Sequence, residues 1–282
     1  MNLRPGLMIM LVAALMGTLS GCAGTKAVEP AERLQAQLLT RAAVGAATRG
    51  NWQVASKNWQ EAAQRHASLD DWTAAGRATL GEAQALVQLG QKTEAIARLT
   101  RLLGSSRYVP PVQAEARYQL ALLAAAAKDA ALAAQHLDAM DSMAGIEPAL
   151  QGAVLNLRAR LAADQGDWQA ARQLAARALV SPGLSSMEAA NAQRLIGEAA
   201  MQTGDWHAAE AALNAALTQD RIQARSAAIA QDLALLAELA DRRGSPEAAM
   251  LRARADDVCN AVRDLSEKAV CAYNRGLPRS GK

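Results

Sequence analysis

The chain repeats one phrase, Gly50-Asn51-Trp52, as Gly166-Asp167-Trp168 and Gly204-Asp205-Trp206, and an alanine-rich run follows each copy. Degenerate copies start at Gly90, Lys128 and Gly244, so the six starts lie 38 or 40 residues apart. A fixed period of this length indicates a repeat architecture, in which each repeat is one supersecondary unit.

The residue types of the phrase suit the turn between two antiparallel helices. Glycine readily takes the left-handed conformation that ends a helix, and Asn or Asp caps the start of the next one. Ser245-Pro246 supplies the same function in the last copy, with proline in the first turn. The spacing of apolar residues between the phrases is helical, so we predict six hairpins, each with a helix A before the phrase and a helix B after it.

Composition supports an all-helical chain. Of 282 residues 69 are alanine, aromatic residues make up 3%, and there is no phenylalanine. Strands favour β-branched and aromatic residues, which excludes most sheet proteins. The 30 Lys and Arg against 27 Asp and Glu leave a net charge of +3, too balanced to indicate nucleic-acid binding.

The pattern resembles the tetratricopeptide repeat, in which small residues recur in both helices of each hairpin. The small position of helix A falls on Ala43, Ala83, Ala121, Ala159, Gly197 and Ala237. That of helix B falls on Ala55, Ala95, Ala133, Ala171, Ala209 and Ala249. The resemblance implies an all-α, right-handed α-solenoid of about six hairpins over residues 32–262.

The period exceeds the usual 34 residues, so we expect extra length in longer helices and in the loops at 104–111, 141–148 and 181–186. Close packing of helices through small residues predicts that the hairpin tryptophans Trp52, Trp168 and Trp206 belong to the core, and Trp59 falls at a helix B packing position. The three histidines, His66, His136 and His207, occupy different repeat positions and are interpreted as surface residues that form no metal site.

The N-terminus reads as an export signal. Arg4 precedes an uncharged apolar stretch over residues 6–18, too short for a membrane span. Leu19-Ser20-Gly21-Cys22 resembles the lipobox of bacterial lipoproteins, which implies removal of residues 1–21, lipidation of Cys22, a tether over residues 22–31 and anchoring at the periplasmic face of the outer membrane. A soluble secreted protein whose signal happens to contain a cysteine is the alternative.

Export places the remaining thiols, Cys259 and Cys271, in an oxidising compartment, so a disulfide between them is expected. We predict a C-terminal capping helix and tail over residues 263–282, which the bond would hold in place. Two buried free thiols on one continuous helix are the alternative.

No catalytic triad, phosphate loop or metal motif is present in the sequence, and the lone carboxylates Glu198 and Glu238 have no separate catalytic domain around them. We therefore predict no enzymatic activity, no cofactor and no metal.

The resemblance implies that helix A residues line a concave groove for a protein or peptide partner. Carried over by position, the groove comprises Arg77, Gln84, Tyr118, Asn156, Arg160, Asn191, Arg194, Glu198 and Gln202. Arg160 and Arg194 are expected to be exposed and to bond a peptide backbone or carboxylate. An ordinary solvated helix face explains the same residues.

The resulting hypothesis is a lipid-anchored periplasmic adaptor for an envelope protein, in pilus, secretion or cell-wall machinery. It would contact the membrane only through its lipid and would bind no nucleic acid. An accessory factor for peptidoglycan metabolism that binds glycan or a cell-wall enzyme is the second hypothesis. A spacer that self-associates through its edge repeats is the third.

Overall fold

A computed structural model describes residues 30–262 and Cys271, and the twelve helices in this part of the chain form six antiparallel hairpins, with no strand among these residues. The helices A are α2 (Ala31–Thr48), α4 (Trp72–Gln88), α6 (Pro110–Ala126), α8 (Pro148–Asp164), α10 (Ser186–Gln202) and α12 (Ser226–Arg242). The helices B are α3 (Trp52–Ser68), α5 (Lys92–Leu103), α7 (Ala130–Asp138), α9 (Trp168–Leu179), α11 (Trp206–Ile222) and α13 (Glu247–Ala261). The all-α repeat solenoid is confirmed.

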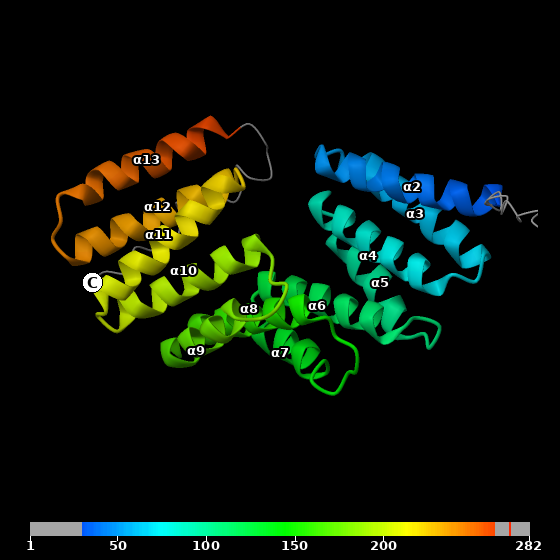
Figure 1. Cartoon of the computed structure of the whole chain (residues 1–282), viewed down its shortest axis with the longest axis horizontal. Helices are drawn as coiled ribbons and strands as arrows, with labels where there is room; N and C mark the ends of the chain where they lie inside the picture. Colours follow the sequence, from blue (N-terminus) through cyan, green and yellow to red (C-terminus); the bar gives the residue numbers. More distant parts are fainter. Residues whose placement is uncertain (1–29, 263–270, 272–282) are drawn as a thin grey trace, which may run out of the picture.

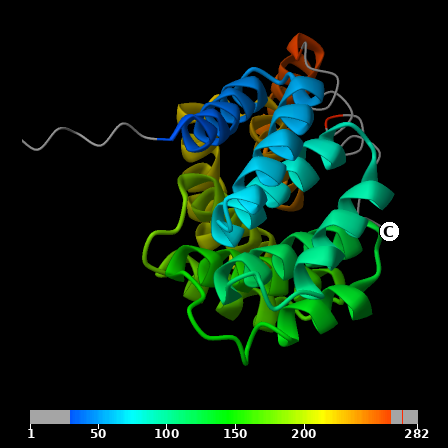
Figure 2. The same cartoon turned by 90° about the vertical axis from the view of Figure 1, so that its right-hand side faces the viewer.

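The hairpins follow one another along an arc (Figures 1 and 2). The first and last hairpins lie at its two ends, and α6 to α9 lie between them. Each helix A from α4 to α12 contacts the next helix A, which places these helices on the inner side of the arc. Side chains of different repeats therefore meet on the helix A surface.

The repeated phrase builds the turns as its chemistry predicts. Gly50, Gly90, Gly166, Gly204 and Gly244 all have positive φ, and Lys128 takes the same conformation in the third hairpin. Where Asn or Asp follows, as in Asp205, its side chain accepts a hydrogen bond from the backbone three residues on. These local bonds fix each hairpin turn.

The extra length of the repeat lies where it was expected. The three loops expected to carry it separate α5 from α6, α7 from α8 and α9 from α10. The first and fifth repeats carry it instead in a helix B of 17 residues, followed by a turn of three residues.

Alanine forms much of the core. The predicted small positions that are alanine in helix A are at most 1% exposed, and those of helix B from Ala55 to Ala209 are fully buried. At Gly197 an added Cβ would come 2.7 Å from Leu213 Cγ, so this position requires glycine for close helix packing. Ala249 is a wrong assignment: Ala248 is buried and Ala249 is exposed. Pro246 already has helical φ and ψ, which shifts the register of α13 relative to the other helices B.

Two expectations about large side chains are also corrected. Trp206 is 36% exposed and Trp52 and Trp168 are only half-buried, because the first residue of helix B lies at the edge of its hairpin. Trp59 is in the core as expected. His66 is buried rather than on the surface, since it continues the inward face of α3, and its Nε2 lies 3.4 Å from Thr40 Oγ1.

Cys271 lies at the C-terminal end of the solenoid and is fully buried. It is joined to Cys259 in a disulfide with a Cα–Cα distance of 5.6 Å. The predicted signal peptide, Cys22 and the tether up to residue 29 lie outside the described residues, as do residues 263–270 and 272–282 of the predicted cap and tail. Across the described helices, none combines the length and apolar character that a bilayer crossing requires.

Candidate partner-binding site

Six of the nine predicted groove residues meet in one pocket of about 210 Å³ on the helix A surface, called here the helix-A pocket. These six are Tyr118, Asn156, Arg160, Asn191, Arg194 and Glu198. Arg77 and Gln84 are exposed on α4, and Gln202 is exposed at the end of α10, and none of the three lines this pocket. The structure thus concentrates the predicted groove on the third to fifth repeats.

Five further residues complete the wall of the helix-A pocket. They are Leu122, Leu157, Glu188, Leu195 and Gln231. The wall therefore comes from α6, α8, α10 and α12, which are four successive helices A. Leu122 is 41% exposed, so the pocket offers an apolar surface beside its polar groups.

Arg194 is the centre of a buried ionic network beneath the pocket. Its Nε lies 2.6 Å from Asp232 Oδ1 and its Nη2 lies 2.5 Å from Asp220 Oδ2, and both aspartates are 0% exposed. Nη1 donates to Asn191 Oδ1 at 3.0 Å. Asp220 also accepts from Arg225 Nη1 at 2.8 Å. The network connects α10, α11 and α12.

The expected exposure of Arg194 is therefore wrong. The residue is 6% exposed, and all three of its nitrogen groups already donate within the protein. A buried guanidinium is favourable only when its partners are in place, because an unpaired buried charge is costly. Arg194 holds the repeats together rather than presenting free donors to a ligand.

Two contacts hold the other side chains of the pocket. Asn156 Nδ2 donates to the backbone oxygen and to Oε2 of Glu188, both at 2.8 Å. Arg160 Nη1 approaches the two carboxylate oxygens of Glu198 at 3.4 and 3.5 Å, which is long for hydrogen bonds. Arg160 is 43% exposed and its Nε faces Asp164 at 3.1 Å. Glu198 is thus weakly paired.

Burial dominates the electrostatics of these groups. It raises the pKa of Asp232 to about 7, although Arg194 acts in the opposite direction. Burial likewise raises the pKa of Glu198, against the effect of Arg160. The pKa of the Tyr118 hydroxyl is raised by burial and by the nearby carboxylates of Glu188 and Glu115. The pocket surroundings therefore disfavour further negative charge.

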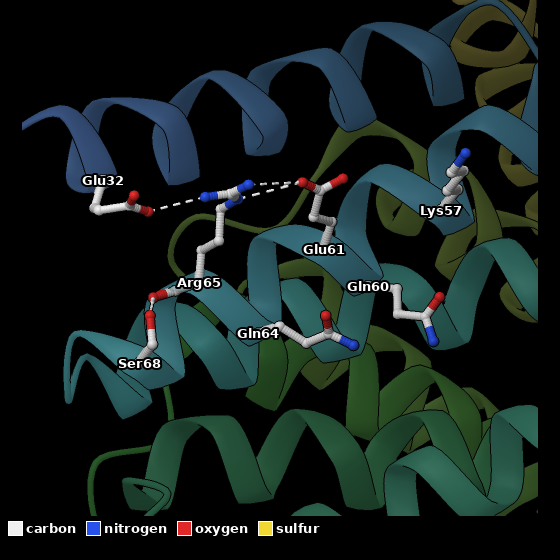
Figure 3. Close-up of a pocket in the computed structure, with 7 residues that line it drawn as sticks. All are labelled: Glu32, Lys57, Gln60, Glu61, Gln64, Arg65 and Ser68. Carbon is white, nitrogen blue, oxygen red and sulfur yellow. Dashed lines mark hydrogen bonds and ion pairs between the residues drawn. The ribbon is translucent and has the colours of Figure 1, made fainter.

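A second, larger hollow of about 460 Å³ lies on the first hairpin (Figure 3). Arg65 bridges Glu32 at 2.9 Å and Glu61 at 3.1 Å there, and the glutamates are 65% and 42% exposed. Exposed ion pairs of this kind hold a surface in place and contribute little energy. We therefore take the helix-A pocket, with its buried network, as the candidate site. No cluster of three or more metal-ligating side chains occurs in the described part of the chain.

A comparison with known protein families finds matches in the same repeats. A model described as "Tetratricopeptide repeat" matches residues 80–144 and 156–225. The two matched stretches are similar to tetratricopeptide repeats. The two matched stretches contain α5 to α7 and α9 to α11 with most of the helices A before them, including most of the helix-A pocket. Tetratricopeptide-repeat folds bind protein partners, so the chain has the architecture of an interaction scaffold.

A solved structure of low sequence identity supports the fold. A chain in the crystal structure of the APC/C hetero-tetramer Cut9-Hcn1 is 16% identical, with a TM-score of 0.63, over 86% of this chain and 45% of that chain. This chain thus spans less than half the length of that relative. A chain in the crystal structure of BtubC (BKLC) from P. vanneervenii is also 16% identical, with a TM-score of 0.48, over 69% of this chain and 93% of that chain. The comparison with curated proteins gives no match.

The sequence reasoning missed the acidic partners Asp220 and Asp232. Glu198 lies 38 residues after Arg160, which is the distance between the fourth and fifth phrases, so these two residues occupy equivalent positions of adjacent repeats and pair across the helix A surface. Asp232 also lies 38 residues after Arg194, but the fifth and sixth phrases are 40 residues apart, so Asp232 lies two positions before the equivalent of Arg194. No comparable spacing indicates Asp220, which comes from helix B.

Proposed function

We propose that the chain is a lipid-anchored periplasmic scaffold that binds a protein partner in envelope assembly, in pilus, secretion or cell-wall machinery, through its helix-A pocket. The observation that carries the binding part is the convergence of four helices A on a pocket that combines an exposed leucine with partly buried carboxylate groups. The proposed role is non-catalytic.

The envelope part of the proposal is supported by the apolar stretch over residues 6–18 and the Leu19-Ser20-Gly21-Cys22 tetrapeptide. Several acyl chains on Cys22 would hold the protein permanently, because each buried CH₂ contributes about 0.8 kcal/mol. We expect Cys22→Ala to release the protein from membranes. Sedimentation of the variant with outer membranes in high salt would show that something other than lipid anchors it.

Partner binding is tested by site-specific photo-crosslinking in cells. A photoreactive residue at position 122 should capture a partner, because Leu122 is exposed at the pocket. The same residue at position 173 is the matched control, since Gln173 is exposed on α9, a helix B. Equal capture from both positions, or capture only from position 173, contradicts binding through the helix-A pocket.

A further inference from the structure

The helix-A pocket has hydrogen-bond acceptors that the surrounding donors leave partly unused. Arg194 has all its nitrogen groups engaged, as described above. Glu188 accepts from Asn156 and Asn191 through Oε2, and Glu198 has two long contacts with Arg160. Asn156 Oδ1 is buried without a protein donor. A ligand that supplies donors fits these groups.

The charges of the pocket and its supporting network are also unbalanced. The carboxylates outnumber the guanidinium groups by five to three. The carboxylates are Asp164, Glu188, Glu198, Asp220 and Asp232, and the guanidinium groups are those of Arg160, Arg194 and Arg225. A cation would be favoured there, whereas a peptide carboxylate would add to the excess.

The placement of the two lining glutamates defines the shape of the ligand. Glu188 and Glu198 are ten residues apart on α10, which corresponds to about 15 Å along the helix. Leu122, Leu157 and Leu195 also line the pocket, and of these three Leu122 is the exposed one. The pocket is thus a short trough that offers two carboxylates spaced along α10 and an exposed leucine on α6. Its volume of about 210 Å³ is below the range of roughly 300–1,000 Å³ for small-molecule sites.

We infer that the helix-A pocket binds a basic, extended segment of its partner protein, with cationic side chains at Glu188 and Glu198 and an apolar side chain between them. In an extended peptide, residues i, i+2 and i+4 share one face, and i and i+4 are about 13 Å apart. A segment with Arg or Lys at i and i+4 and Leu at i+2 matches the trough. The inference rests on the proposed scaffold function and names the chemistry of its partner.

The test is a titration of the purified protein with three short acetylated and amidated peptides. They are Arg-Ala-Leu-Ala-Arg, its neutral analogue Gln-Ala-Leu-Ala-Gln and its acidic analogue Glu-Ala-Leu-Ala-Glu. Methyl NMR of labelled leucines gives the readout, because Leu122, Leu157 and Leu195 line the pocket. We expect the basic peptide to shift these resonances at a concentration at least about tenfold lower than either analogue, as the loss of one charged hydrogen bond would give.

Two variants test whether the Glu198 carboxylate itself contributes to binding of the basic peptide. Glu198→Gln keeps the shape of the side chain and should weaken the basic peptide about tenfold. Glu210→Gln is the control, since Glu210 of α11 pairs with Arg243, the residue after α12, outside the pocket. Preference for the acidic peptide, or no shift with any peptide, overturns the inference. Photo-crosslinking from position 122 would still report independently whether the scaffold function holds.

Discussion

Arg194 is the residue on which the packing of the fifth and sixth repeats depends. Its guanidinium neutralises Asp220 and Asp232, both fully buried. Removing one partner of a buried ion pair typically costs about 3–5 kcal/mol, because the remaining charges stay buried and uncompensated. We expect Arg194→Ala to lower the free energy of unfolding by that amount, measured by urea denaturation followed by circular dichroism.

Arg160→Ala is the control for Arg194→Ala. Arg160 is 43% exposed and its partner Asp164 is 57% exposed, so the ion pair should contribute about 1 kcal/mol or less. Equal destabilisation by the two substitutions would contradict the structural role assigned to Arg194.

Asp232 gives the stability a pH dependence of known sign. Burial raises the pKa of Asp232 from 3.8 to about 7. An acid whose pKa is higher in the folded chain binds more protons when folded, so its stabilising contribution is complete below about pH 4 and is lost as the pH rises toward 7. The side chain of the Asp232→Asn variant cannot ionise, so the variant should not lose this stabilising contribution as the pH rises. The free energy of unfolding of the variant, relative to that of the natural chain, should rise between about pH 4 and about pH 7. Parallel pH profiles of the two proteins in urea denaturation would contradict the prediction.

The burial and the contacts of individual side chains were harder to predict from the sequence than the helices or the number of repeats. The sequence placed six pocket residues together, because equivalent repeat positions project on one face. It did not reveal that Arg194 is buried, since the residue lies on a helix face whose burial is set by Asp220 and Asp232 in other helices. The burial of a polar residue can be predicted only when the residue that pairs with it is known.

At the level of elements, the third hairpin turn departs from the others. Lys128 has a φ of 60° where the other five hairpin turns have glycine. A residue with a Cβ pays roughly 1–2 kcal/mol in the left-handed conformation, part of which the greater freedom of unfolded glycine offsets. We expect Lys128→Gly to raise the free energy of unfolding by about 1 kcal/mol or less.

The converse substitution tests the same argument. Gly204→Ala places a Cβ at a φ of 76°, and the fifth hairpin should lose about 1 kcal/mol. Thermal denaturation of both variants checks the two signs. A destabilised Lys128→Gly variant together with an unaffected Gly204→Ala variant would show that backbone conformation does not limit these turns.

Hairpins were predictable because their signals are local. A left-handed glycine and a capping aspartate act within four residues, so the six turns can be read from the chain directly. The register of α13 was not predictable in the same way. Pro246 starts helical geometry before the helix proper, and this shift by one residue exchanges Ala249 for Ala248 in the core.

For the whole molecule, the period predicted the number of repeats, and stacking of hairpins on their neighbours then follows. The helix-A pocket required more than the period. It depends on which of several equivalent surfaces carries incompletely paired carboxylates and an exposed leucine, and that follows from contacts between repeats. The three-dimensional structure therefore separates the third to fifth repeats from Arg77 and Gln84 of the second.

The ends of the solenoid lead to the last prediction, which concerns the disulfide. Cys271 is fully buried against Val262 and Ala230, so its bond to Cys259 ties residue 271 to the last hairpin. Closing a loop of this size stabilises by about 3 kcal/mol in the chain-entropy model. Because repeats contact mainly their neighbours, we expect Cys271→Ser to increase hydrogen exchange in α12 and α13 and to leave α2 to α5 unchanged. Reducing agent should reproduce the effect in the natural chain and add nothing in the variant. Unchanged exchange in α13, or an increase that is uniform from α2 onward, would show that the bond does not act as an end cap.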